Sequence, residues 1–162
     1  MLTTLTIFSA LITLGALVLA FIPRSYAPAT CWAGMLLMHF SGNAVVSTGV
    51  LAWWGTAALI VLGIGYLSPS GLPFPRAANF YTTGGAVAGA LVGLLAASYG
   101  LIIGAVVGAV LGAMAYMRTP QGRRAAGGGG MLGSILAVCG LPSVVTVSIA
   151  GYTLTAIMMP TI

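Results

Sequence analysis

The chain has 162 residues, of which 60% are hydrophobic, and its mean hydropathy is +1.15. It contains no aspartate, glutamate or lysine, and five arginines give it a formal net charge of +5. This composition is typical of an integral membrane protein. It excludes chemistry that needs carboxylates, such as general acid–base pairs and Mg²⁺ or Ca²⁺ binding. We therefore expect no enzyme activity and no cofactor, and the spread of the arginines suits lipid better than nucleic acid.

Three apolar segments in the first 67 residues are predicted to enter the membrane. The first, residues 5–22, is about long enough to span. We expect it to be a retained helix rather than a signal peptide, because no basic residue precedes it and Arg24 follows it directly. The second, near residues 28–43, is short for a full span and could lie partly in the interface. The third, near residues 45–67, is a strong span with Tyr66 near its end, as in an interfacial aromatic belt.

Residues 68–79 are predicted to form a loop, because the prolines at 69, 73 and 75 cannot continue a helix. The segment that follows, residues 83–117, carries glycines at a four-residue spacing. Residues four apart lie on one side of a helix, so each row of glycines forms a groove along which a second backbone can approach closely. We predict that these glycines are helix-packing residues: Gly85, Gly89, Gly93, Gly100, Gly104, Gly108 and Gly112.

Segment 83–117 is too long for one crossing. As a single helix it would be about 50 Å long, whereas the hydrocarbon core of a bilayer is about 30 Å thick. We predict a helical hairpin that turns at residues 98–100. A single bent helix is the alternative, because the seven-residue step from Gly93 to Gly100 keeps roughly the same helix face. The arginines favour the hairpin, since only then do all five lie on one side of the membrane, with the N-terminus outside.

Residues 118–130 are predicted to form a second loop that holds Arg118, Arg123 and Arg124. These three arginines are candidates for contact with lipid head groups, although a role as simple topology anchors is the more common one. The last apolar segment, residues 130–159, is also long for a straight crossing. We expect it to kink at Pro142 or to break there into two short helices, which leaves the side of the C-terminus open.

The remaining polar side chains form no catalytic pattern. His39 has no acidic partner or second histidine, so we expect an interfacial, solvated side chain. Cys31 and Cys139 are expected to be small apolar residues rather than a disulfide. Hydroxyl groups are expected to hydrogen-bond between helices rather than to act as nucleophiles, because the chain has no activating base; the pairs concerned are Thr82 and Thr83, and Thr146 and Ser148.

The order of these elements, with the two glycine rows and Gly133 in the final segment, resembles a widespread bacterial family of small integral-membrane proteins classed as a domain of unknown function. The resemblance covers nearly the whole chain and implies no activity. We predict an all-α fold: one polytopic helical domain of the cell (inner) membrane with a glycine-zipper hairpin. The expected function is non-enzymatic, by packing or oligomerising through glycine helices, with membrane lipid and a second copy or another membrane protein as partners. The alternative is a small pore or carrier lined by broken helices.

Overall fold

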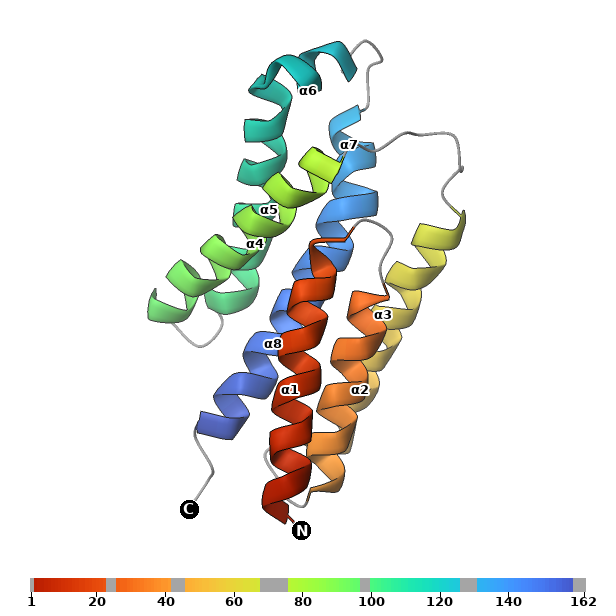
Figure 1. Ribbon diagram of the computed structural model, residues 1–162, viewed down its shortest axis with the longest axis vertical. Coiled ribbons are helices and arrows are strands. Elements are labelled where there is room, and N and C mark those ends of the chain that lie inside the picture. The colour runs from red at the N-terminus through yellow and green to blue at the C-terminus, as the bar shows by residue number, and fades with distance from the viewer. Residues whose placement is uncertain are drawn as a thin grey trace.

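The computed structural model describes residues 2–22, 26–41, 46–67, 76–96, 100–125 and 131–158. Within these ranges the chain is helical, with short turns and no strand, so the predicted all-α fold is confirmed (Figure 1). The helices are α1 (Leu2–Ala20), α2 (Ala27–Phe40), α3 (Thr48–Leu67), α4 (Arg76–Ala96), α5 (Gly100–Arg118), α6 (Pro120–Ala125), α7 (Met131–Ile135), the π-helical turn η1 (Leu136–Gly140) and α8 (Leu141–Met158).

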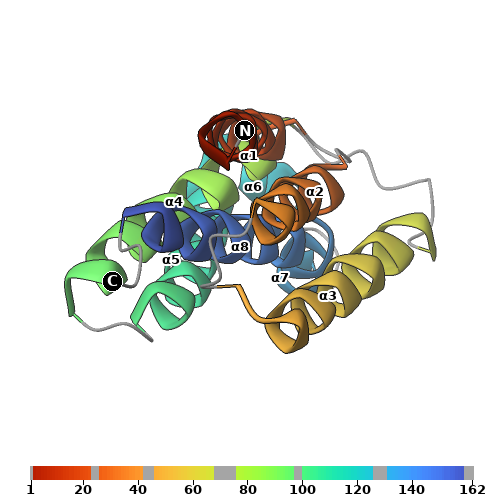
Figure 2. The same cartoon turned by 90° about the horizontal axis from the view of Figure 1, so that it is seen from below.

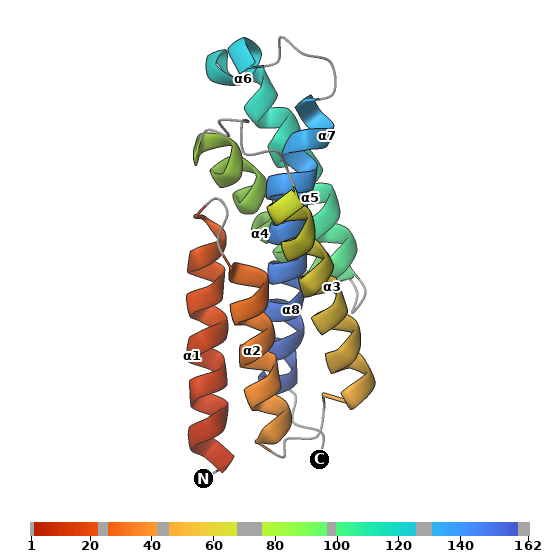
Figure 3. The same ribbon diagram turned by 90° about the vertical axis from the view of Figure 1, so that its right-hand side faces the viewer.

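Four helical segments are long and apolar enough to cross a membrane. They are α3, α4, α5 and the stretch Gly133–Met158, which joins α7, η1 and α8. A shorter apolar stretch, Thr4–Ala20, lies in α1, and α2 has only 14 residues, fewer than the roughly 20 that a span needs. The long segments alternate in direction along one axis (Figures 1 and 3). The chain is therefore a multi-pass helical membrane protein.

The helix at the centre of this bundle is α8. It contacts α1, α2, α3, α4 and α5, and a view along the bundle shows it between the other helices (Figure 2). All residues from 145 to 150 are buried, which covers every side of a helix. The sequence of α8 contains no charged residue, so none of its faces has to reach water. The glycine segment, which the sequence suggests as the main packing unit, instead packs against this central helix.

The predicted hairpin over residues 83–117 is confirmed as two separate helices, α4 and α5, but it begins earlier than expected. Gly100, predicted to lie in the turn, instead begins α5, and residues 98 and 99 lie outside the described residues. Arg76–Ala96 is helical, so the prediction that residues 76–79 belong to a loop is wrong, whereas residues 68–75 lie outside the described residues. Proline stops a helix that reaches it from the N-terminal side, but it is well tolerated just before or at a helix start. Pro75 therefore does not prevent a helix from beginning at the next residue.

The predicted loop over residues 118–130 also contains a helix, α6. Pro120 occupies its first position, where the missing N–H is not needed. The Thr119 hydroxyl accepts a hydrogen bond from the Gly122 N–H at 3.1 Å, which satisfies one of the free donors of the first turn. This local capping explains why a glycine- and arginine-rich segment is helical here. Residues 126–130 lie outside the described residues.

The final segment does not break at Pro142. The helix passes from α7 through η1 into α8 without interruption, and the Leu141 N–H donates to the Leu136 carbonyl, five residues earlier. A proline ring clashes with the carbonyl four residues before it, and a π-helical turn in front of it changes where those carbonyls lie. The end of α8 therefore lies at the same end of the bundle as the start of α1 (Figure 1).

Candidate functional site

The two helices of the hairpin are in contact through their glycines. Gly85, Gly89 and Gly93 of α4 face Gly108, Gly104 and Gly100 of α5, in that order. The order is reversed between the helices, so α4 and α5 run antiparallel. A Cβ atom added to any of these six glycines would meet a backbone carbonyl oxygen of the facing helix, and one added to Gly112 would meet the carbonyl of Tyr81. All seven glycines predicted from the sequence thus lie in one contact within the chain.

The alanines beside the glycine rows turn toward the centre of the bundle. Ala86 and Ala90 of α4, with Ala105 and Ala109 of α5, are buried in a cluster with Val147 of α8. Small side chains let two helices approach closely. The glycines do this between α4 and α5, and the alanines do it between this pair and α8. The hairpin therefore packs onto α8 as one unit. Gly84 faces away from this contact, since a Cβ added there would have nothing within 4 Å.

A second site is a group of buried polar atoms where α4, α8 and the end of α1 meet. The hydroxyl oxygens of Thr83 and Ser143 are 2.8 Å apart, and Ser143 also donates to the Cys139 carbonyl at 2.7 Å. The Ala20 carbonyl accepts a hydrogen bond from Asn79 Nδ2 at 3.0 Å, and Thr83 Oγ1 lies 3.3 Å from the same oxygen. The one Thr83 hydroxyl proton can go either to this carbonyl or to Ser143. Ala20 ends α1, where a carbonyl has no partner within its own helix. The cluster therefore closes the end of α1 and joins three helices.

The hydroxyls singled out in the sequence play different parts. Thr83 bonds between helices, as expected, whereas Thr82 and Thr146 donate to carbonyls of their own helices. Ser148 Oγ on α8 is buried without a hydrogen-bond partner among the described residues. Asn79 and Ser143 were missed, because Asn79 was placed in a loop. Two features of the sequence pointed to these residues. Asn79 is an asparagine next to a strongly apolar segment, and Ser143 directly follows Pro142.

The described arginines lie at one end of the bundle. Arg76 begins α4, Arg118 ends α5, and Arg123 and Arg124 lie on α6; all four are exposed. These elements meet at the end where α1 finishes and α2 starts (Figure 3). Arg24 lies outside the described residues. The described arginines therefore have the one-sided distribution that the positive-inside rule predicts, and they are available to lipid phosphates.

The remaining candidates are occupied by structural contacts. His39 Nδ1 lies 2.8 Å from the Val46 carbonyl oxygen, which ties the end of α2 to the start of the next segment. Cys31 and Cys139 are free and buried. Among the described residues there is no group of three or more His, Cys, Asp or Glu that could hold a metal ion.

Comparisons with known proteins leave the function to be argued from this geometry. No family model, no curated protein and no solved structure matches the chain.

Proposed function

We propose that this chain is a non-enzymatic protein of the cell (inner) membrane that acts by binding a second copy of itself or another membrane protein, with the glycine-packed hairpin as its rigid framework. The continuous contact between the backbones of α4 and α5 supports the rigid framework, and the exposed side chains of α3 support the binding of a partner. In lipid, helices gain little from burying apolar surface, so close packing of this kind is a main source of stability.

A partner has to bind outside the hairpin contact, because each glycine row is already filled by the other. The most open span is α3, where 17% of an 18-residue apolar stretch is buried, against 39% of the corresponding stretch in α4 and in α5. Trp53 and Ile60 lie seven residues apart on α3, hence on about the same face, and their side chains are 74% and 58% exposed. Exposed aromatic residues often carry much of the binding energy at protein interfaces. We place the partner on this face of α3.

The proposed lack of enzyme activity rests on the chemistry of the chain. It has no Asp, Glu or Lys, and the buried hydroxyls of Thr83 and Ser143 have their hydrogen-bond partners within the cluster. The one histidine, near the end of α2, lies at the opposite end of the bundle from Ala20, beside which Thr83 lies (Figure 1). A serine or threonine nucleophile needs a neighbouring base, and this geometry offers none at the cluster.

The association can be tested by co-purification in mild detergent with the mass measured by light scattering. We expect a defined oligomer or a stoichiometric complex with another membrane protein. Trp53→Ala with Ile60→Ala should weaken it, whereas Val92→Ala on α4, at a similarly exposed position, should not. A monodisperse monomer without a partner, for the wild type in several mild detergents, would refute the proposal.

A carrier is the second candidate, favoured by one feature of α8. The π-helical turn η1 lies directly before α8 in the continuous helix, next to the buried polar cluster of Thr83 and Ser143. Turns of this type are frequent at functional sites. A carrier would open this cluster to water in one of its states.

Cysteine labelling separates the two candidates. In a chain with Cys31→Ala and Cys139→Ala, Ser143→Cys should resist a membrane-impermeant thiol reagent, because Ser143 is only 2% exposed. Gln121→Cys on the exposed surface of α6 should react and serves as the positive control. Labelling of Ser143→Cys in intact membranes, at a rate that a transported solute changes, would favour the carrier over our leading proposal.

A further inference from the structure

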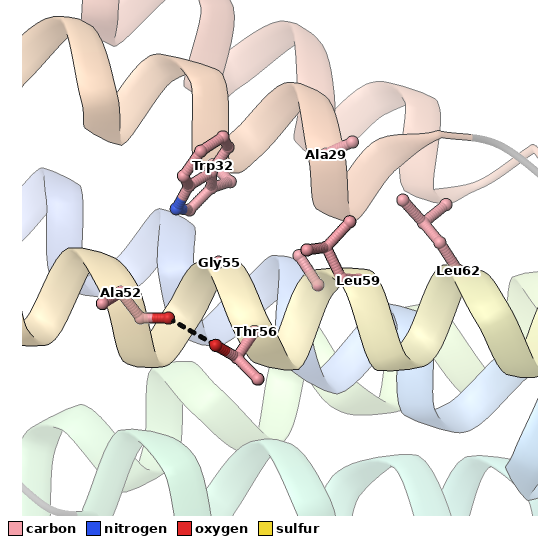
Figure 4. Close-up of a pocket in the computed structure, with 8 residues that line it drawn as sticks. Ala29, Trp32, Ala52, Gly55, Thr56, Leu59 and Leu62 are labelled. Carbon is pink, nitrogen blue, oxygen red and sulfur yellow. Dashed lines mark hydrogen bonds between the residues drawn. The ribbon is translucent and has the colours of Figure 1, made fainter.

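A groove runs between α2 and α3 on the surface of the bundle. It encloses about 380 Å³, and its walls include Ala29, Trp32, Gly55, Thr56, Leu59 and Leu62 (Figure 4). Leu59 is 71% exposed, so the groove opens outward rather than into the core. Because α3 is long and apolar enough to span, this opening faces the lipid at the depth of the hydrocarbon core.

Contacts between the two helices close the groove toward both ends. On one side the Trp32 indole lies against Gly55, where an added Cβ would lie 2.8 Å from Trp32 Nε1. On the other side the hydroxyls of Tyr26 and Tyr66 are 2.7 Å apart, three residues before Ala29 and four after Leu62. We call this groove, with the indole in its wall and the pair of phenols beyond Leu62, the slot.

The polar groups of the slot already have hydrogen-bond partners within the protein. Trp32 Nε1 donates to the Leu51 carbonyl at 3.0 Å, and Thr56 Oγ1 donates to the Ala52 carbonyl at 2.8 Å (Figure 4). A polar ligand would find no free donor on Trp32 or Thr56, and burying it would cost free energy. The slot therefore suits a purely apolar occupant.

The size of the slot selects among apolar occupants. A helix with its side chains is about 10–12 Å across, so that one turn of 5.4 Å fills about 500 Å³. This is more than the groove's volume of about 380 Å³, whereas an extended hydrocarbon chain is much thinner. The tyrosine pair lies toward the end of the bundle where α2 begins and α3 finishes, the same end as Arg76, Arg118 and α6 (Figure 3). Tyrosines favour the level of the head groups, and arginines attract anionic lipids.

We propose that this slot binds one acyl chain of an anionic phospholipid, whose ester and head-group region lies beside Tyr26 and Tyr66. The bound chain fills the gap between α2 and α3 and fixes the position of α3. The site requires only that the chain spans a membrane. It borders the face proposed for the protein partner, because Thr56 lies between Trp53 and Ile60 on the same side of α3.

The test places a large side chain in the slot, in one variant from α2 and in another from α3. Ala29→Phe and Thr56→Phe add a ring from α2 and from α3, and Val92→Phe on the exposed face of α4 is the control. Native mass spectrometry of protein purified in mild detergent and mixed with phosphatidylglycerol should show one tightly held lipid in the wild type and the control. Each filled variant should lose lipid affinity by about tenfold or more, because the ring takes the volume of the chain.

Fluorescence gives an independent reading in vesicles. With Trp53→Phe and Trp54→Phe, Trp32 is the one tryptophan left of three. Phosphatidylglycerol with a brominated acyl chain should quench the fluorescence of Trp32 when the slot is open. The same mole fraction of this lipid should leave the Trp32 fluorescence of the filled variants unchanged. Equal lipid retention and equal quenching in the filled variants and the control would overturn the proposal. A change of oligomer mass in the filled variants, with unchanged lipid retention, would also overturn it and would assign the slot to a protein partner.

Discussion

Leucine at Gly85 is expected to destabilise the protein strongly, whereas leucine at Gly84, its neighbour in α4, is expected to be tolerated. A Cβ at Gly85 would meet the Gly108 carbonyl oxygen and lie 3.0 Å from the Gly112 Cα, but a Cβ at Gly84 would have nothing within 4 Å. Both substitutions gain roughly 1 kcal/mol in helix propensity. The difference between them therefore isolates the contact between the two helices.

The size of the effect follows from what the new side chain meets. Overpacking a core costs about 1–3 kcal/mol and occasionally more. We expect the upper end of this range at Gly85, because the atoms in the way belong to a backbone and cannot turn aside as a side chain can. Gly104→Leu and Gly108→Leu should behave like Gly85→Leu, since an added Cβ would meet Gly89 and Gly85 carbonyls.

The measurement is the thermal unfolding temperature in detergent, with a second control at Val106. That residue of α5 is 45% exposed, so Val106→Leu should change the unfolding temperature little. If Gly84→Leu and Gly85→Leu unfolded at the same temperature, the glycine contact would not be a packing contact.

The second large effect is an all-or-none difference in labelling from the two sides of the membrane. Gln121→Cys should react with an impermeant thiol reagent only from the cytoplasm, and Ser47→Cys and Met158→Cys only from the other side. Gln121 lies on α6 beside Arg123 and Arg124, whereas Ser47 directly precedes α3 and Met158 ends α8, at the opposite end of the bundle (Figure 1). Arginine-rich ends remain in the cytoplasm by the positive-inside rule.

The parent for these variants carries Cys31→Ala and Cys139→Ala. Because both native cysteines are buried, the unmodified chain should itself react slowly and provides a further control. Reaction of Gln121→Cys and Met158→Cys from the same side would contradict the continuous helix from α7 to α8 and would restore a break at Pro142.

The features that could be predicted from the sequence depend on neighbours along the chain. A four-residue spacing of glycine defines a helix face by itself, so the contact surfaces of α4 and α5 are readable without a structure. Their antiparallel pairing followed from two further facts, the length of the segment and the positions of the arginines. Helix ends were less predictable where a residue such as Thr119 caps a helix inside an apparent loop.

The choice of the central helix was decided only by the tertiary structure. In a water-soluble protein a buried helix differs in composition from a surface helix, but in a membrane both are apolar, because lipid tails resemble the protein core. Nothing in the sequence therefore distinguishes α8, buried on every side, from the open α3. For the same reason the sequence does not predict the slot between α2 and α3, because Gly55 and Trp32 come into contact only after the helices pack.

The polar cluster could not be predicted, because its residues lie far apart along the chain. Asn79 and Thr83 reach the Ala20 carbonyl across 59 and 63 residues, and Ser143 joins Thr83 across 60. Such pairs have no local signature, since a hydroxyl in a helix can equally donate to the carbonyl four residues earlier, as Thr82 does. The sequence determined that hydroxyls would serve as hydrogen-bonding groups within the membrane. Which of them would join two helices was decided by the packing of α1 and α4 around α8, because only that packing brings the free carbonyl at the end of α1 to α4.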